Sequence, residues 1–419
     1  MKVLHLINSD GPAGGGGGMS ALRLHQSLLK CGAQSVMLCR RTFTGVPEVH
    51  AFDRLKHLDQ ITYLLTSPLG LGDLHRLSSF LLLRDPRFRD ADVVHLHGLH
   101  GGDWYVNYLV LPRLTRAKPT ILTIRDMWCL TGHCAVNYDC DRWKTGCGRC
   151  PHLDAPPSTK RDTTRLQWRL KNRVYRRSDL TVVSLCSWYT ERARQSMLSR
   201  FPIHQIPNGV DTDVFEPIDR TLCRRLLGLP LDKQIVLYAA RDLSEHNKGP
   251  DLLRRALAGL PDDLKARTVL LLAGHRGHSI AQGCPVPCID MGFISGDRFR
   301  AVACAAADLF VSPTRLEAFG QVILESLACG VPVVSFRVGG VPDLVRPGHT
   351  GYLAEPEDPD DLRDGIVQLL RDHDLRRTLG ENARCMAQTE FSTDLEAERY
   401  WNLYRTVLET RQSSKGGRT

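Results

Sequence analysis

The sequence contains no run of 18 or more apolar residues, which excludes a conventional transmembrane helix. Its first eight residues have the pattern of a strand and not that of a signal peptide. Acidic residues are scarce in the first half, where residues 1–205 hold 16 Asp and Glu against 29 Lys and Arg. We therefore expect a cytoplasmic protein with one basic half that attracts polyanions.

The densest basic stretch is residues 160–177, which has the spacing of a helix. Its apolar residues recur on one side of an otherwise cationic surface, and they are Leu166, Leu170, Val174 and Tyr175. This pattern fits a solvated helix that docks through one apolar stripe. It also fits a patch that binds an anionic membrane surface, and the sequence leaves both interpretations open.

Short apolar runs alternate with amphipathic stretches along the whole chain. The runs predict strands at residues 2–7, 35–39, 93–96, 120–124, 180–184, 235–240, 268–273, 309–311 and 331–335. Because 419 residues are too many for one ordinary α/β core, we predict an α/β protein with two doubly wound, parallel-sheet domains facing across a cleft.

Two glutamates eight residues apart, Glu317 and Glu325, lie between the apolar runs 307–311 and 331–336. Glu317 is expected in the loop that leaves a strand, and Glu325 in the helix that follows. Both would then lie at the carboxyl edge of a sheet, where a helix beginning near Gly320 offers N–H groups to a phosphate. Alternatively, one glutamate caps the helix and the other is a solvated surface charge.

Two cations follow the strand predicted at 235–240. Arg241 ends the strand, and Lys248 precedes a Gly-Pro pair suited to a helix start. An arginine and a lysine held in this way can clamp a diphosphate, although two cations in a loop are often only surface residues.

Five consecutive glycines, Gly14 to Gly18, come between the first strand and a helix expected from Met19. Such a turn can bring backbone N–H groups against a phosphate or an acceptor, or it can be a flexible surface loop. No Lys-Ser or Lys-Thr pair follows the glycines, which excludes a P-loop.

Polar residues also follow two neighbouring strands of the first half. His95, His97 and His100 end one of them, and Arg125 and Asp126 end the next. Arginine cannot act as a neutral base, so His97 or Asp126 is the candidate for acceptor chemistry, and Arg125 could contact an acidic or phosphorylated acceptor. A structural role is the alternative for each.

The chain has 14 cysteines, and several of them cluster in residues 129–150. Four thiolates at suitable spacing for a tetrahedral zinc site are Cys134, Cys140, Cys147 and Cys150. Disulfides are the alternative, which a reducing compartment disfavours.

Several of these segments resemble the retaining GT-B glycosyltransferases of family 4. The resemblance covers most of residues 1–408 and rests on the Glu317 to Glu325 spacing, the Arg241 and Lys248-Gly pair, and the run Ile-Pro-Asn-Gly-Val-Asp-Thr-Asp-Val-Phe at 206–215. The cysteine cluster resembles a subgroup that builds bacterial exopolysaccharide and O-antigen. The resemblance implies metal-independent hexosyl transfer from a UDP- or GDP-sugar to a saccharide or lipid-linked saccharide.

The resemblance also implies roles for single residues. Arg241 and Lys248 would hold the diphosphate, and Glu325 the ribose hydroxyls. Glu317 would address the donor sugar and its phosphate together with the N–H groups of Phe319, Gly320 and Gln321. Gly17 and Gly18 match a Gly-Gly pair that faces the donor, whereas Arg125 stands where related chains usually have histidine.

We predict an N-terminal domain at 1–205 with the cysteine-rich insert, a nucleotide-sugar domain at 206–390, and a helix at 391–410 that packs back on the N-terminal domain. A disordered tail is expected at 411–419. The enzyme would be cytoplasmic or peripheral on the cytoplasmic membrane face. Two other activities fit the sequence: a nucleotide-sugar epimerase on the same fold, and a zinc-containing nucleic-acid-binding protein, although few aromatics accompany the basic stretch and we expect no nucleic-acid partner.

Overall fold

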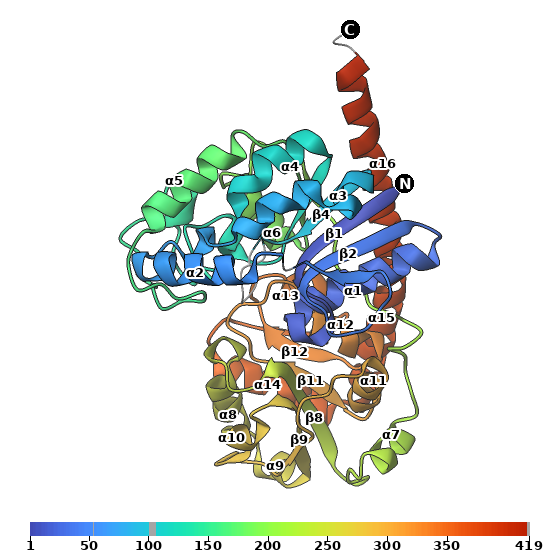
Figure 1. Cartoon of the computed structure of the whole chain (residues 1–419). Coiled ribbons are helices and arrows are strands. Elements are labelled where there is room, and N and C mark those ends of the chain that lie inside the picture. The colour runs from blue at the N-terminus through green and yellow to red at the C-terminus, as the bar shows by residue number, and fades with distance from the viewer. Residues whose placement is uncertain (53, 100–105, 417–419) are drawn as a thin grey trace. The chain divides into compact units, whose positions relative to one another are not determined.

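The computed structural model describes residues 1–52, 54–99 and 106–416 (Figure 1). The chain divides into two compact units, one made of Met1–Pro207 with Glu396–Thr419 and the other of Asn208–Leu395. His100 and the last three residues of the predicted tail lie outside the described residues. No helix in the described part of the chain is both long and apolar enough to cross a bilayer.

The first unit is built on a seven-stranded parallel sheet in the order β3-β2-β1-β4-β5-β6-β7. Its strands are β1 Lys2–Ser9, β2 Gln34–Arg41, β3 Val49–Ala51, β4 Val93–His97, β5 Thr120–Ile124, β6 Thr181–Ser184 and β7 Ile203–Gln205. The α-helices are α1 Gly15–Lys30, α2 Lys56–Thr66, α3 Pro86–Asp90, α4 Leu111–Ala117, α5 Thr164–Tyr175, α6 Ser187–Arg194 and the final α16 Thr393–Gly416. Short 3-10 helices complete it: η1 Gly11–Gly14, η2 Ser67–Leu69, η3 Gly72–Leu74, η4 Leu77–Arg84, η5 Tyr108–Val110, η6 Met127–Cys129 and η7 Arg142–Lys144.

The second unit repeats this plan with a six-stranded parallel sheet in the order β10-β9-β8-β11-β12-β13. Its strands are β8 Gln234–Asp242, β9 Thr268–His275, β10 Cys288–Asp290, β11 Leu309–Ser312, β12 Val333–Phe336 and β13 Gly351–Ala354. Its helices are α7 Arg220–Leu226, η8 His246–Lys248, α8 Pro250–Ala258, α9 Asp262–Arg267, α10 Gly277–Ala281, α11 Asp297–Ala305, α12 Gln321–Ala328, α13 Val341–Leu344, α14 Pro359–Arg371 and α15 His373–Glu390.

The predicted α/β class with two doubly wound sheets is confirmed. Every strand expected from an apolar run is present, with ends that differ by a few residues at most. The strands β3, β7, β10 and β13 were not predicted, because segments of three or four residues at or near a sheet edge carry too little periodicity. In each sheet the order reverses between its first strand and its fourth, β1 and β4 or β8 and β11. Open α/β sheets bind ligands at the carboxyl ends of strands beside such a point.

The first helix begins earlier than its glycines suggested. Gly15 to Gly18 already belong to α1, whereas we expected a turn as far as Gly18. A side chain at Gly18 would place its Cβ only 2.7 Å from the carbonyl oxygen of Gly11 and 2.9 Å from that of Ser9. The glycines therefore let the start of the helix pack directly on the backbone that leaves β1.

The final helix packs in the core of the first unit, where Tyr400, Leu403 and Tyr404 are buried with Val3 and Val93. It also continues through residues 411–416, which we expected to be disordered. Arg411 anchors the start of this extension, because its guanidinium donates hydrogen bonds to the carbonyl oxygens of Thr115, at 2.9 Å, and Arg116 at the end of α4.

In the second unit the loops after β8 and β11 approach each other closely. Gly249 adopts a φ of +67°, and a Cβ there would lie 1.8 Å from the carbonyl oxygen of Pro313. Only glycine allows both this conformation and this contact. The two loops are therefore held together at the sheet's point of reversal.

Replacing Gly249 with alanine should destabilise the second unit strongly. Gly283→Ala is a matched control, because Gly283 has a φ of +69° and open space around its Cβ position. Both variants incur the cost of about 1–2 kcal/mol for placing a side chain in the left-handed backbone conformation. Only Gly249→Ala also forces its loop away from the backbone of Pro313. Urea unfolding should give a distinctly larger loss of unfolding free energy for Gly249→Ala, and equal losses would contradict the contact.

Candidate functional site

Lys248 and Glu317 meet where the loops after β8 and β11 come together. Lys248 Nζ donates a hydrogen bond of 2.8 Å to Glu317 Oε2. The two side chains keep only 24% and 18% of their surface exposed. The structure thus brings together a cation and an acid that are 69 residues apart in the sequence.

The backbone on both sides of this pair is fixed by further hydrogen bonds. Asn247 Nδ2 donates to the carbonyl of Leu316 at 2.8 Å, and the Arg315 N–H donates to the carbonyl of Asn247 at 2.9 Å. The Gly340 N–H donates to the carbonyl of Glu317 at 2.9 Å. Glu317 is therefore held from two directions before any ligand arrives.

Lys248 remains charged in this setting. Burial opposes its positive charge, but the neighbouring Glu317 carboxylate outweighs burial and raises the pKa of Lys248 above its ordinary value, with a further contribution from Glu245. An ammonium group has three hydrogens, so Lys248 can hold Glu317 and still donate to a phosphate.

The N-terminus of α12 lies directly after Glu317. The capping residue Gly320 adopts a φ of +94°, and the Ala318 N–H donates to Glu317 Oε1 at 3.2 Å. Within the described residues the N–H groups of Phe319 and Gly320 have no hydrogen-bond acceptor. A cation, an acid and two free N–H groups thus gather at one strand end, which suits a phosphorylated ligand.

The other residues predicted to contact the sugar-nucleotide donor differ in how exposed they are. Arg241 is exposed near the end of β8, and its side chain makes no ion pair or hydrogen bond with the described residues. Glu325 is only 3% exposed, and Arg300 of α11 donates to its Oε1 at 3.2 Å. Gln321 uses its side-chain amide on the carbonyl of Gly209, at 3.1 Å.

Neither glutamate is therefore an ordinary solvated charge. Arg300 was not identified from the sequence, because an arginine three residues after an aspartate looks like an ordinary ion pair on a helix surface. The structure does contain this pair, with Arg300 and Asp297 2.8 Å apart. Its second contact, with Glu325, depends on the packing of α11 against α12.

In the first unit Arg125 connects the predicted acceptor residues. Its guanidinium donates to His97 Nδ1 at 2.8 Å, and its Cδ lies 3.2 Å from the Cβ position of Gly17 in the first turn of α1. Asp126 accepts a hydrogen bond of 2.9 Å from the Trp128 N–H and so caps η6.

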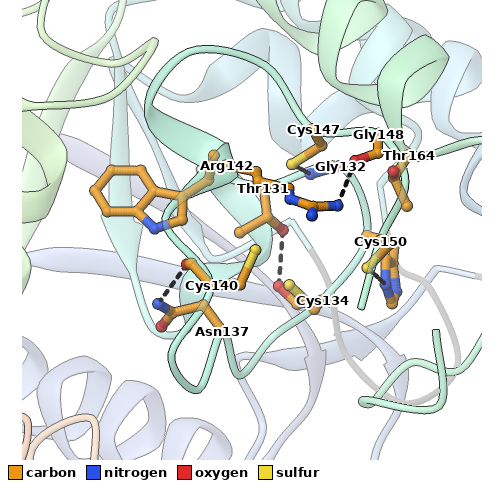
Figure 2. A pocket seen from close by; sticks show the side chains of 12 residues that line it. Thr131, Gly132, Cys134, Asn137, Cys140, Arg142, Cys147, Gly148, Cys150 and Thr164 are labelled. Carbon is orange, nitrogen blue, oxygen red and sulfur yellow. Dashed lines mark hydrogen bonds between the residues drawn. The ribbon is translucent and has the colours of Figure 1, made fainter. Parts of the chain in front are cut away.

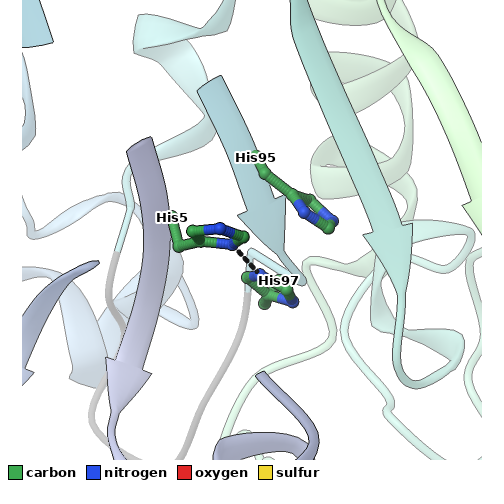
Figure 3. A group of neighbouring side chains, drawn as sticks. All are labelled: His5, His95 and His97. Carbon is green, nitrogen blue, oxygen red and sulfur yellow. Dashed lines mark hydrogen bonds between the residues drawn. The ribbon is translucent and has the colours of Figure 1, made fainter. Parts of the chain in front are cut away.

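The hydrogen bonds fix which ring nitrogen of His97 carries its proton, and Figure 3 shows the bond from His97 to His5. Arg125 can only donate, so His97 Nδ1 accepts and His97 Nε2 carries the proton that it donates to His5 Nδ1 at 2.8 Å. His95 bonds to the hydroxyls of Tyr404 and Thr123 at 2.8 and 2.7 Å. Both ring nitrogens of His97 are thus engaged within the protein, which leaves none to deprotonate an acceptor in this arrangement.

The ring nitrogens of His5, His95 and His97 lie within 4.8 Å of one another, as in a metal site. Burial lowers the pKa of all three well below the ordinary value, and the positive charge of Arg125 lowers it further. The same charge would repel a metal cation. The cluster is therefore a group of packed, neutral histidines, of which His97 bonds to Arg125 and orients it.

Four cysteines predicted to bind zinc also come together in the first unit. Cys134, Cys140, Cys147 and Cys150 all line one small cavity (Figure 2).

The buried histidines His5, His95 and His97 should make the unfolding free energy fall in mild acid. Their pKa is lowered in the folded protein but is about 6.5 in the unfolded chain, so the unfolded state binds more protons as pH drops below about 6.5. Each histidine should contribute a loss of unfolding free energy that approaches about 1.4 kcal/mol per pH unit as the pH falls below this value. His95→Gln should reduce this slope in urea unfolding, whereas His57→Gln on the exposed surface should not. A stability that is flat between pH 7.5 and 5.5 would contradict the network.

Comparison with known proteins relates both units to one group of enzymes. The model of "Glycosyltransferase Family 4" matches residues 14–214, and that of "Glycosyl transferases group 1" matches residues 219–386. A curated relative, D-inositol 3-phosphate glycosyltransferase of Mycobacterium avium (strain 104), is 33% identical over 219 residues, 50% of each chain. The chain thus spans about half the length of the curated relatives it matches.

Solved structures share the fold over nearly the whole chain. Sucrose-phosphate synthase from Thermosynechococcus elongatus is 21% identical, with a TM-score of 0.73 over 98% of this chain and 100% of that one. HepE from Anabaena, solved with UDP and glucose, is 17% identical, with a TM-score of 0.67 over 97% of this chain and 100% of that one. Since the two family models together cover most of both units, the chain belongs to the family 4 glycosyltransferases of the GT-B fold.

Proposed function

We propose that this protein is a retaining glycosyltransferase that moves a hexosyl group from a UDP- or GDP-sugar to a saccharide acceptor in cell-surface polysaccharide synthesis. The observation that carries the proposal is the Lys248–Glu317 ion pair beside the free N–H groups of Phe319 and Gly320. It supports the proposal because the fixed positive charge of Lys248 would stabilise the negative charge that develops on a diphosphate leaving group, and the carboxylate beside it would accept hydrogen bonds from sugar hydroxyls.

In the proposed reaction Lys248 keeps one N–H on Glu317 and turns the others to the donor diphosphate. The N–H groups at the start of α12 bind a phosphate oxygen, and Arg241 closes on the diphosphate from the end of β8. Glu325, oriented by Arg300, accepts hydrogen bonds from the ribose. The cations neutralise the leaving group, so no divalent metal is needed, and the departing phosphate helps to take the proton of the acceptor hydroxyl.

For the acceptor we propose a saccharide that carries a phosphate or carboxylate, as a lipid-linked saccharide does. Arg125 supports this choice, because the hydrogen bond to His97 fixes its planar guanidinium beside the first turn of α1. The name of the relative from Mycobacterium avium includes a phosphorylated compound, D-inositol 3-phosphate.

Glu317→Gln and Lys248→Ala should each lower transfer by about 10²–10³-fold while the protein stays folded, because each removes a fixed charge from the leaving-group site. The assay follows nucleoside diphosphate release from a panel of nucleotide sugars, with thermal stabilisation identifying the donor. Matched controls are Glu355→Gln and Lys265→Ala, in more exposed ion pairs of the same unit.

Full activity in either site variant would overturn the assignment of these residues. Donor consumption and sugar isomerisation without any acceptor would indicate the epimerase instead. Salt-sensitive binding of random RNA or DNA, without stabilisation by any nucleotide sugar, would favour a nucleic-acid-binding protein.

We further propose that the enzyme works as a peripheral protein on an anionic membrane. Helix α2 buries only Asp59 and exposes a row of apolar side chains, Leu58, Ile61, Leu64 and Leu65, of which the last two are 66% and 68% exposed. Leu69 in η2 extends this apolar surface. An apolar patch of this kind on a basic unit is typical of an interaction site.

Helix α5 lies next to this patch, since Thr163 and Gln167 both donate hydrogen bonds to the carbonyl of Gly70 (Figure 1). The apolar stripe predicted for α5 does not dock as a whole: Val174 and Tyr175 are buried, but Leu166 is 54% exposed. Exposed arginines flank Leu166 at positions 161, 165 and 169. Apolar side chains beside arginines match the interface of an anionic bilayer.

The protein should sediment with vesicles rich in phosphatidylglycerol at low salt and not with neutral phosphatidylcholine vesicles. Replacing Leu64 and Leu65 together with aspartate should weaken binding by at least about tenfold, because inserting a leucine contributes about 1.5–3 kcal/mol. Leu222→Asp with Leu226→Asp is the matched control, since those leucines are 51% and 67% exposed in the other unit. Equal loss in both pairs, or no sedimentation of the unaltered protein, would refute the membrane proposal.

A further inference from the structure

The segment between β5 and α5 is folded around a small cavity although it has little regular structure. Among its described residues, η6 and η7 are the helical pieces, each of three residues. The cavity has a volume of about 20 Å³, and its lining includes Cys134, Cys140, Cys147, Cys150 and His133 (Figure 2). A space of this size holds one water molecule or one ion.

The four cysteines are free thiols directed around the same space. None of them forms a disulfide. As thiols they are only weak hydrogen-bonding groups, whereas as thiolates their sulfur atoms would be satisfied by bonds to a metal ion.

The backbone around Cys147 is shaped to present its sulfur. Gly146 and Gly148 adopt φ values of +137° and +135°, which glycine alone adopts readily. The Gly132 N–H donates a hydrogen bond of 3.2 Å to Cys147 Sγ. An N–H group directed at sulfur stabilises a thiolate more than a thiol.

His133 also lines the cavity, beside Cys150. The carbonyl of Pro157, 3.2 Å from His133 Nδ1, can only accept, so Nδ1 carries the proton. The other ring nitrogen, Nε2, lies 3.4 Å from Cys150 Sγ and keeps its lone pair. His133 is therefore held with its unprotonated nitrogen facing the Cys150 sulfur.

We propose that this cavity holds one structural Zn²⁺ bound by the thiolates of Cys134, Cys140, Cys147 and Cys150, with His133 packed against Cys150. Four sulfur ligands suit Zn²⁺ or an iron–sulfur cluster, and the small space of about 20 Å³ favours the single ion. No three of these ligand atoms lie within 4.8 Å of one another in the described structure. Zinc–sulfur bonds of about 2.3 Å would therefore draw the side chains inward.

The ion would fix the segment that carries Asp126 and ends at α5. That segment is already tied to α5 by buried Lys171, which donates to the carbonyls of Trp128 and Thr131 at 2.9 and 3.2 Å. Zinc would secure its other, cysteine-rich half. The proposal concerns the folded segment alone and does not depend on the transferase activity.

Elemental analysis of the full chain, purified without chelator, should find about one zinc per chain. Cys147→Ser with Cys150→Ser should lose nearly all of it. Cys31→Ser with Cys385→Ser is the matched control and should retain it, because those cysteines are exposed and lie outside the cavity. His133→Ala should also retain it, and loss there with retention in Cys150→Ser would overturn the four-cysteine ligand set.

A second measurement avoids the risk that a cysteine variant does not fold. Titrating the unaltered protein with an organomercurial should release zinc to a chromogenic chelator as the thiols react. Cobalt reconstitution should give the strong visible absorption of a tetrahedral thiolate site. Absence of zinc from the purified protein, the spectrum of an iron–sulfur cluster, or disulfides among these cysteines by mass spectrometry would each overturn the proposal.

Discussion

Both parallel sheets are covered on two faces, and this burial determines where the protein can carry charge. Strands such as β5, β6 and β12 are buried along their whole length. An unpaired charge inside such a layer is very costly, so acids and cations gather in the loops beyond the strand ends. Lys248 and Glu317 occupy such loops after β8 and β11, the neighbouring strands at which the sheet order reverses.

The Lys248–Glu317 pair depends on the scaffold around it. Each group partly compensates the other's loss of solvent, and removal of one would leave the other partly buried without its counter-charge. The hydrogen bonds of Asn247 and Gly340 hold the loops in place, so the charges need little rearrangement when a diphosphate binds. Such preorganisation is what makes an electrostatic site effective.

Three buried histidines of the first unit are accommodated without charge. His5, His95 and His97 lie within the sheet but stay neutral, because each bonds to neighbours and burial disfavours a proton. His95 bonds to Tyr404 of the C-terminal helix α16 and packs against His97, whose ring bonds to Arg125 at the strand end. The two units thus share a fold but present different chemistry at the ends of their strands.

The sequence by itself determined the α/β class, most strands and the place of Glu317 in a loop beside a helix, because these follow from periodicity within short segments. Tertiary structure alone decided that Glu317 pairs with Lys248 and that Arg300 bonds to Glu325. It also decided that both ring nitrogens of His97 form hydrogen bonds with neighbouring side chains. It also decided that α1 starts at Gly15 and that Leu166 stays exposed. The physical reason is that hydrophobic spacing reports which face of an element is buried, whereas the partner of a polar side chain is set by loops that meet from distant parts of the chain.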